Sequence, residues 1–234
     1  MKVKVSYQTL QLPPPLAFAY TLEMEFHEEE IKIQYDLEFL NRDEITLEEI
    51  EEEGFSENDD YSWTGTLGKA WIEDLYDDLL EVDLEDESED FNIYLHMEIS
   101  HDGQEDSGIA VMAEDWDYRL QEVIQAIYEK AGIEDKLKLK FIHQANGERS
   151  FYELEGSFEH KTCQINQKDI SWDELHQLMS DVYTIDFEGE SVEKPSGDGL
   201  WIDQDAMSGY QLFDEQAGPR ASKIKSRILD ILER

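Results

Sequence analysis

The stretch FAYTLEMEFHEEEIKIQYDLEF, residues 18–39, alternates apolar and polar residues on both sides of a run of acids. A period of two is typical of a strand with one buried face, so two strands joined by a loop over 27–30 are predicted. This hairpin sets Glu25 opposite Lys32 on its solvent face. Its buried face pairs apolar residues across the two strands: Phe26 with Ile31, Met24 with Ile33, and Leu22 with Tyr35.

Four helices follow from capping and periodicity. A short one begins at a capping box formed by Thr46 and Glu49 and ends at Gly54. Apolar residues three or four apart predict longer helices over 66–80 and 115–131. Ser171 and Glu174 form a second capping box, which opens a helix that runs to about 183.

Two further hairpins are expected, over 91–112 and over 137–158, the latter turning at Asn146-Gly147. A hairpin followed by a helix therefore occurs three times, at 18–80, 91–131 and 137–183. This order predicts an α+β fold, in which an antiparallel sheet of about three hairpins carries its helices on one face. A C-terminal helix completes it.

The expected domain organisation is one α+β domain over 1–187, which includes a highly acidic segment at 43–106. Residues 188–218 contain several glycines and little periodicity, so a Gly-rich loop is predicted there. Residues 219–234 form a basic amphipathic helix, which we expect to dock on the same domain.

Charge is the strongest functional signal in this chain of 234 residues, whose formal net charge is −39. Segment 43–106 alone has 25 Asp and Glu against a single Lys69, a net charge of −24. Such a field repels nucleic acid and anionic membranes and attracts basic protein surfaces. No run reaches the ~18 apolar residues of a membrane span. The single Cys163 excludes an internal disulfide, so a cytoplasmic, reducing location is expected.

The predicted function is non-catalytic: binding of a basic partner protein, as an inhibitor, an immunity-type antidote or a nucleic-acid mimic. Acids at the end of a helix oppose its dipole and so reduce its stability. An accessory subunit whose acidity serves solubility, in a high-salt habitat or elsewhere, is an alternative. Nine carboxylates of the acidic segment are the expected contact residues: Glu51, Glu52, Glu53, Asp59, Asp60, Asp74, Asp77, Asp78 and Glu81.

A second alternative is a divalent-metal-dependent hydrolase with a carboxylate site near 198–214. Asp203, Asp205 and Asp214 match positions 1, 3 and 12 of a calcium loop. Met207 stands where an oxygen ligand belongs, and Gly209 comes one position late. Calcium or magnesium is thus the one cofactor that the sequence indicates, and no other is expected.

Nucleophilic and phosphate-binding motifs are missing from the sequence. Cys163 with a His base is a candidate nucleophile, with His160 three positions before it, but a lone Cys is more often a small buried hydrophobic residue. The C-terminal helix has the one basic cluster of the chain. Its expected partner is the chain's own acidic region, and an external anionic ligand is the alternative. The cluster comprises Arg220, Lys223, Lys225 and Arg227.

Overall fold

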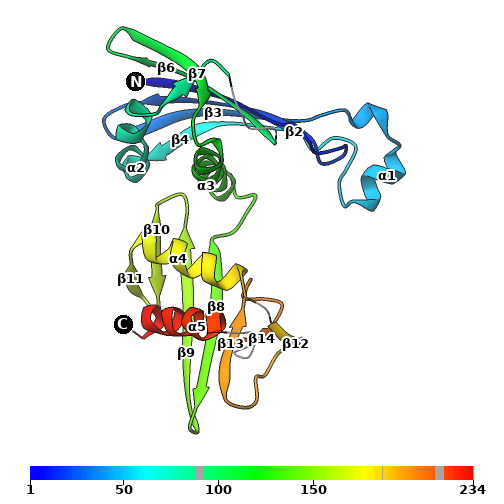
Figure 1. The fold of residues 1–234 in the computed structure, drawn as a ribbon, viewed down its shortest axis with the longest axis vertical. Coiled ribbons are helices and arrows are strands. Elements are labelled where there is room, and N and C mark those ends of the chain that lie inside the picture. The colour runs from blue at the N-terminus through cyan, green and yellow to red at the C-terminus, as the bar shows by residue number, and fades with distance from the viewer. Residues whose placement is uncertain (88–91, 186, 214–218, 234) are drawn as a thin grey trace. The chain divides into compact units, whose positions relative to one another are not determined.

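The computed structural model describes residues 1–87, 92–185, 187–213 and 219–233 (Figure 1). They form two compact units: unit 1 is Met1–Ile133 and unit 2 is Glu134–Arg234. This corrects the expectation of one α+β domain over 1–187. The boundary falls after the helix that Gly132 ends, because the strands on either side of it join different sheets. Among the described residues, no helix is long and apolar enough to cross a membrane.

Unit 1 contains a seven-stranded antiparallel sheet in the order β4-β3-β2-β1-β6-β7-β5. A 3-10 turn, Arg42–Glu44, precedes helix α1. The three helices are α1 (Leu47–Glu52), α2 (Lys69–Leu80) and α3 (Ala113–Ala131). The strands are β1 (Lys2–Thr9), β2 (Phe18–Phe26), β3 (Glu30–Phe39), β4 (Tyr61–Gly68), β5 (Leu84–Glu85), β6 (Ile93–His101) and β7 (Gln104–Ala110).

Unit 2 contains a second seven-stranded antiparallel sheet, in the order β11-β10-β9-β8-β13-β14-β12. Its helices are α4 (Trp172–Tyr183) and α5 (Pro219–Leu232). The strands are β8 (Leu137–Ala145), β9 (Glu148–Ser157), β10 (Thr162–Ile165), β11 (Lys168–Ile170), β12 (Phe187–Val192), β13 (Gly199–Asp203) and β14 (Tyr210–Phe213).

The two units share one topology. Numbered from its own first strand, each sheet has the order 4-3-2-1-6-7-5, and each unit has one helix after its fourth strand and one after its seventh. They differ in the connection between the third and fourth strands. In unit 2 this is the two-residue turn Asn166-Gln167, with both residues at positive φ, whereas in unit 1 it comprises residues 40–60 and contains α1. We call residues 40–60 the acidic arm.

Helices α2 and α3 pack on one face of the unit 1 sheet, and α4 and α5 pack on one face of the unit 2 sheet, whereas α1 lies in the acidic arm. In unit 1, Tyr76 of α2 contacts Phe26 and Tyr128 of α3 contacts Tyr35, and both partners are on the buried face of the sheet. In unit 2, α4 and α5 pack on the buried side chains of β8, β9, β10 and β13, around Phe141 and Ile228. The C-terminal helix is therefore docked on unit 2.

The structure confirms several local predictions. The 18–39 hairpin has the expected register, with Phe26 opposite Ile31 and Glu25 opposite Lys32. Both capping boxes form, at Thr46 and at Ser171. Gly132 ends α3 with a positive φ of 71°.

Two predictions need correction. The helix expected over 66–80 begins at Lys69, because residues 61–68 pair with β3 as strand β4. The region expected as a loop, 188–218, contributes to three strands, and β13 among them pairs directly with β8. The fold is thus mixed helix and antiparallel sheet, as expected, but two seven-stranded sheets replace one sheet of three hairpins.

Candidate functional site

The acidic charge is concentrated in unit 1. Unit 1 has 37 Asp and Glu against seven Lys and Arg, a formal net charge of −30, and unit 2 has 21 against 12, a net charge of −9. Because both units fold with the same topology, this topology does not itself require a charge of −30. The surplus acid of unit 1 is a property of its surface.

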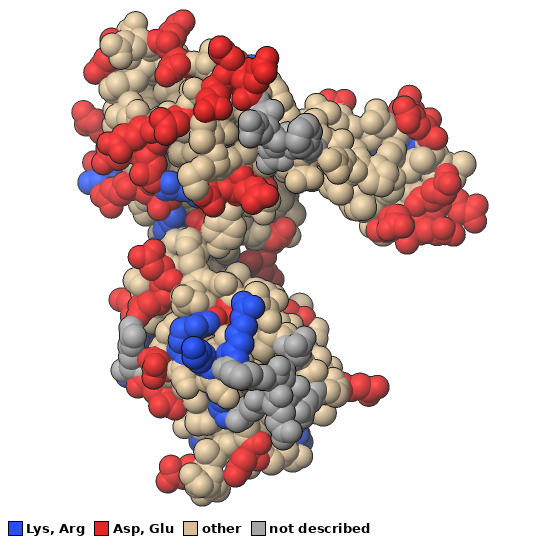
Figure 2. Space-filling model, in the orientation of Figure 1, with Lys and Arg blue, Asp and Glu red and all other residues tan. Residues whose placement is uncertain are grey.

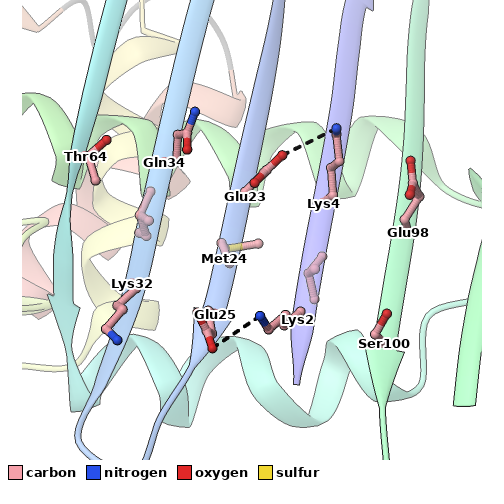
Figure 3. Close-up of a pocket in the computed structure, with 12 residues that line it drawn as sticks. Lys2, Lys4, Glu23, Met24, Glu25, Lys32, Gln34, Thr64, Glu98 and Ser100 are labelled. Carbon is pink, nitrogen blue, oxygen red and sulfur yellow. Dashed lines mark ion pairs between the residues drawn. The ribbon is translucent and has the colours of Figure 1, made fainter. Parts of the chain in front are cut away.

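Part of the open face of the unit 1 sheet is electrically balanced. The face of the sheet opposite the helices has a shallow cavity of about 400 Å³, and Figure 3 shows its polar side chains in cross-strand rows. Lys2 pairs with Glu25 at 3.4 Å, and Lys4 with Glu23 at 3.4 Å. Together with Lys32 and Glu98, the charged residues lining this cavity are three Lys and three Glu. The lining of this cavity therefore carries no net charge, in contrast to unit 1 as a whole.

The acidic arm leaves the sheet at the end of β3 and returns to it at the start of β4 (Figure 1). Figure 2 shows carboxylates over much of its surface. It contains ten Asp and Glu against one basic residue, Arg42. Three of the predicted contact residues, Glu51, Glu52 and Glu53, are exposed at the end of α1, where carboxylates oppose the helix dipole. Nine of the ten carboxylates are exposed: Asp43, Glu44, Glu48, Glu49, Glu51, Glu52, Glu53, Glu57 and Asp60.

Arg42 fixes the base of this arm. Its side chain is only 8% exposed, and its guanidinium lies 3.9 Å from the Phe39 ring centre and 5.1 Å from that of Phe55. It donates to Asp59 at 2.7 Å and to the Ser56 carbonyl at 2.8 Å. The Ser56 hydroxyl, followed by other contacts that include Arg42, holds the pKa of Asp59 below its usual range.

Asp59 and Asp60, both predicted as contact residues, therefore have roles inside the arm. Asp59 accepts from Arg42 and from the Ser56 amide, and Asp60 accepts from the Phe39 amide at 2.8 Å. These bonds join the two ends of the arm to each other, so the arm presents the carboxylates of α1 on an ordered base.

We expect Arg42→Lys to loosen this base. Lysine keeps the charge but loses the planar guanidinium that lies against the two rings. Backbone amides of residues 43–58 should then exchange with solvent ~10-fold faster, because cation–π contacts at desolvated sites contribute up to ~2 kcal/mol. Hydrogen exchange measured by mass spectrometry tests this. Lys69→Ala, which removes an exposed pair with Glu73, is the control and should change nothing there. Unchanged exchange in Arg42→Lys would refute this role.

The four contact residues predicted on or beside α2 differ in their environment. Asp77 and Glu81 are exposed. Arg119 of α3 donates to the Asp78 carboxylate and to the Asp74 carbonyl at 2.9 Å, and its charge lies 3.9 Å from the Asp74 carboxylate. Asp78 and Asp74 thus join α2 to α3, while Asp77 and Glu81 remain available to a partner.

Two of the three predicted metal ligands lie close together. Asp203 ends β13 and is 4% exposed, and burial, followed by the Asp205 side chain, raises its pKa. Asp205 accepts from the amides of Met207 at 2.8 Å and Ser208 at 2.7 Å, and hydrogen bonds led by the Ser208 hydroxyl lower its pKa. Its oxygens thus stabilise the turn. Asp214 lies outside the described residues, within which no group of three potential metal ligands occurs.

Cys163 is a core residue of unit 2. It is 2% exposed, and burial raises its pKa to about 12. A thiol with this pKa is almost entirely protonated at neutral pH, so it is a poor nucleophile. The His160 side chain is 62% exposed and its imidazole is 3.9 Å from Glu159. These contacts favour the structural interpretation of Cys163.

The C-terminal basic cluster is partly explained within unit 2. Arg227 makes a two-pronged pair with Asp181 of α4, through Nε at 3.0 Å and through Nη2. The observed partner of Arg227 is therefore Asp181 and not segment 43–106, where the sequence analysis expected it. Arg220 and Lys223 are exposed on α5.

Comparison with known proteins adds no relative: no family model, curated protein or solved structure matches the chain. The function is therefore inferred from the residues themselves. Two of these residues were not predicted as functional from the sequence. Arg42 and Arg119 pair with acids of the candidate surface that are distant in the chain. The sequence feature that could have revealed them is that each is an isolated basic residue among acids.

Proposed function

We propose that the chain is a non-catalytic interaction protein that binds a basic partner protein through the exposed carboxylates of the acidic arm and α2. Inhibition of that partner, in an immunity-type or nucleic-acid-mimic role, is the activity that such a surface supports. The observation that carries the proposal is the contrast between two units of one topology. Only unit 1 has a net charge of −30, and only in unit 1 is the connection between the third and fourth strands a long acidic arm.

The placement of the charge favours binding over solubility alone. A surface that serves only solubility gains most from evenly spread acid. Here the cavity on the open face of the sheet is lined by three Lys and three Glu, while the arm has ten acids against Arg42. Glu51, Glu52 and Glu53 also lie where they destabilise α1. Local stability lost in this way is typical of residues kept for binding.

The exposed carboxylates also form a surface that attracts cations, because most basic residues of unit 1 are already paired. Five of the seven basic residues of unit 1, Lys2, Lys4, Arg42, Lys69 and Arg119, already pair with acids of the same unit. The field of unit 1 therefore steers a basic protein toward it, which raises association rates at low ionic strength.

Affinity capture tests this function. The full chain, immobilised, should retain a basic protein from a native extract at low salt and release it at high salt. The Glu51→Gln/Glu52→Gln variant should lose that protein. The Glu28→Gln/Glu29→Gln variant, which removes the same charge from two exposed acids of the β2–β3 turn, should retain it.

Two outcomes decide the interpretation. If both double variants retain the same proteins as the unmodified chain, the arm is not the binding surface and the proposal is wrong. Release of the captured protein by added duplex DNA would assign the nucleic-acid-mimic role, because DNA and the arm would then compete for one basic surface.

A further inference from the structure

Unit 1 contains an apolar cavity of about 390 Å³, on the side of the sheet where α3 packs. Its volume falls within the ~300–1,000 Å³ typical of small-molecule sites. Its lining is mainly aromatic and aliphatic, and it includes five polar side chains or hydroxyl-bearing rings: Tyr20, Tyr35, Asp117, Gln121 and Tyr128. The segments that form it are β2, β3, the β1–β2 connection, the acidic arm and α3.

Two polar atoms in this lining are buried without a hydrogen-bond partner in the described part of the chain: the Tyr20 hydroxyl and Asp117 Oδ1. Tyr20 is 4% exposed. The other carboxylate oxygen of Asp117 accepts from Gln121 Nε2 at 2.9 Å, which orients the carboxyl group. Both residues line this one cavity, and burial, followed by the Asp117 charge, raises the pKa of Tyr20.

Such atoms reduce the stability of a fold. A buried donor or acceptor without a partner costs ~1–3 kcal/mol, and buried polar groups are almost always satisfied. Burial also raises the pKa of Asp117, which means that its charged form is disfavoured where it lies. An apolar residue at position 117 would avoid both penalties. A bound ligand that donates hydrogen bonds would satisfy both atoms at once.

The surroundings define the charge of that ligand. The net charge of −30 on unit 1 repels anions. A neutral apolar ligand leaves Asp117 Oδ1 unpaired. A cation is favoured by Asp117 and by the faces of the aromatic rings. Phe39 and Phe55, two walls of the cavity, already hold the Arg42 guanidinium at 3.9 Å and 5.1 Å.

We propose that this cavity binds a small organic ammonium ion, whose amine donates to Asp117 Oδ1 and to the Tyr20 hydroxyl oxygen while its apolar body packs on the surrounding rings. The site is independent of partner binding, because neither group belongs to the exposed carboxylates of the arm or α2. Either proposal stands if the other fails.

Three probes of similar size and different charge test the site on the full chain: protonated 2-phenylethylamine, neutral 2-phenylethanol and anionic 3-phenylpropanoate. Calorimetry should show one site for the ammonium ion, ~10-fold or more weaker binding of the alcohol, and no binding of the anion, because a charged hydrogen bond contributes ~1.5–3 kcal/mol. Equal binding of the amine and the alcohol, or no binding of the amine, would overturn the proposal. This comparison needs no variant.

Variants then locate the site. Asp117→Asn keeps the shape of the side chain and removes its charge, so it should weaken amine binding ~10-fold and leave the alcohol unchanged. Tyr20→Phe should weaken amine binding several-fold. Glu114→Gln removes an exposed charge from the first turn of the same helix and should change nothing. If Asp117→Asn, shown to be folded by circular dichroism, binds the amine as tightly as the unmodified chain, the site lies elsewhere.

Discussion

Arg227→Met is expected to lower the thermal midpoint of unit 2 by on the order of 10 °C. Asp181 is 2% exposed, and Arg227 contacts both of its carboxylate oxygens. Removal of the arginine leaves a buried carboxylate without a cation, which is among the most destabilising changes a single substitution makes. Circular dichroism of the full chain, with hydrogen exchange to separate the two units, measures the effect.

Two further variants identify the cause. Arg220→Met removes an exposed charge from the same helix and should leave the midpoint of unit 2 nearly unchanged. Asp181→Leu combined with Arg227→Met replaces the pair with two apolar side chains and should recover most of the lost stability. If Arg227→Met and Arg220→Met shift the midpoint equally, the pair does not hold α5 on α4.

Replacement of residues 40–58 by Asn-Gly is expected to leave the sheet of unit 1 folded and to remove most partner binding. Leu37 pairs with Tyr61, so a two-residue turn between Phe39 and Asp59 continues the β3–β4 register. Unit 2 makes the equivalent connection with two residues, Asn166 and Gln167. Asn-Gly is the sequence that a tight hairpin turn of this kind prefers.

The same replacement removes eight acids together with Arg42. The association rate with the captured basic protein should fall ~10- to 100-fold at low salt, within the range that electrostatic steering provides. Surface plasmon resonance measures the rate, and the Glu28→Gln/Glu29→Gln variant is the control. A folded arm-less variant with an unchanged association rate would place the binding surface outside the arm.

Local elements of this fold were predictable because their signals are contained within the elements. The β2–β3 hairpin shows its period of two in consecutive residues, so even its register followed from the sequence. The capping boxes at Thr46 and Ser171 need residues only three positions apart. The turn at Asn146-Gly147 has both residues at positive φ, as its sequence indicated.

Elements that depend on distant partners were not predictable in the same way. β13 lies in a Gly-rich region and is held by its pairing with β8, where Leu200 is opposite His143. β1 lies between β2 and β6, and nothing local to residues 2–9 specifies these neighbours. The shared topology of the two units also stayed hidden, because it is a property of strand order and not of residue identity.

In the candidate site, too, local features were predictable from the sequence and contacts between distant residues were not. The acidic segment is visible as composition, but the internal pairs within it are not, because Arg42 and Arg119 are 17 and 41 residues from the acids they hold. Asp117 resembles an ordinary helix acid in the sequence. Its buried oxygen becomes evident only where α3 meets the aromatic end of β2 and β3.

The salt dependence of the association rate tests the central claim most directly. Exposed charges are screened over ~10 Å at 0.1 M salt and ~3 Å at 1 M. The rate constant for the full chain and the captured basic protein should therefore fall steeply as salt rises across this range, and the arm-less variant should show a much flatter dependence. A rate constant that is independent of salt, or equally dependent on it in both proteins, would contradict the claim that the acidic arm recruits the partner.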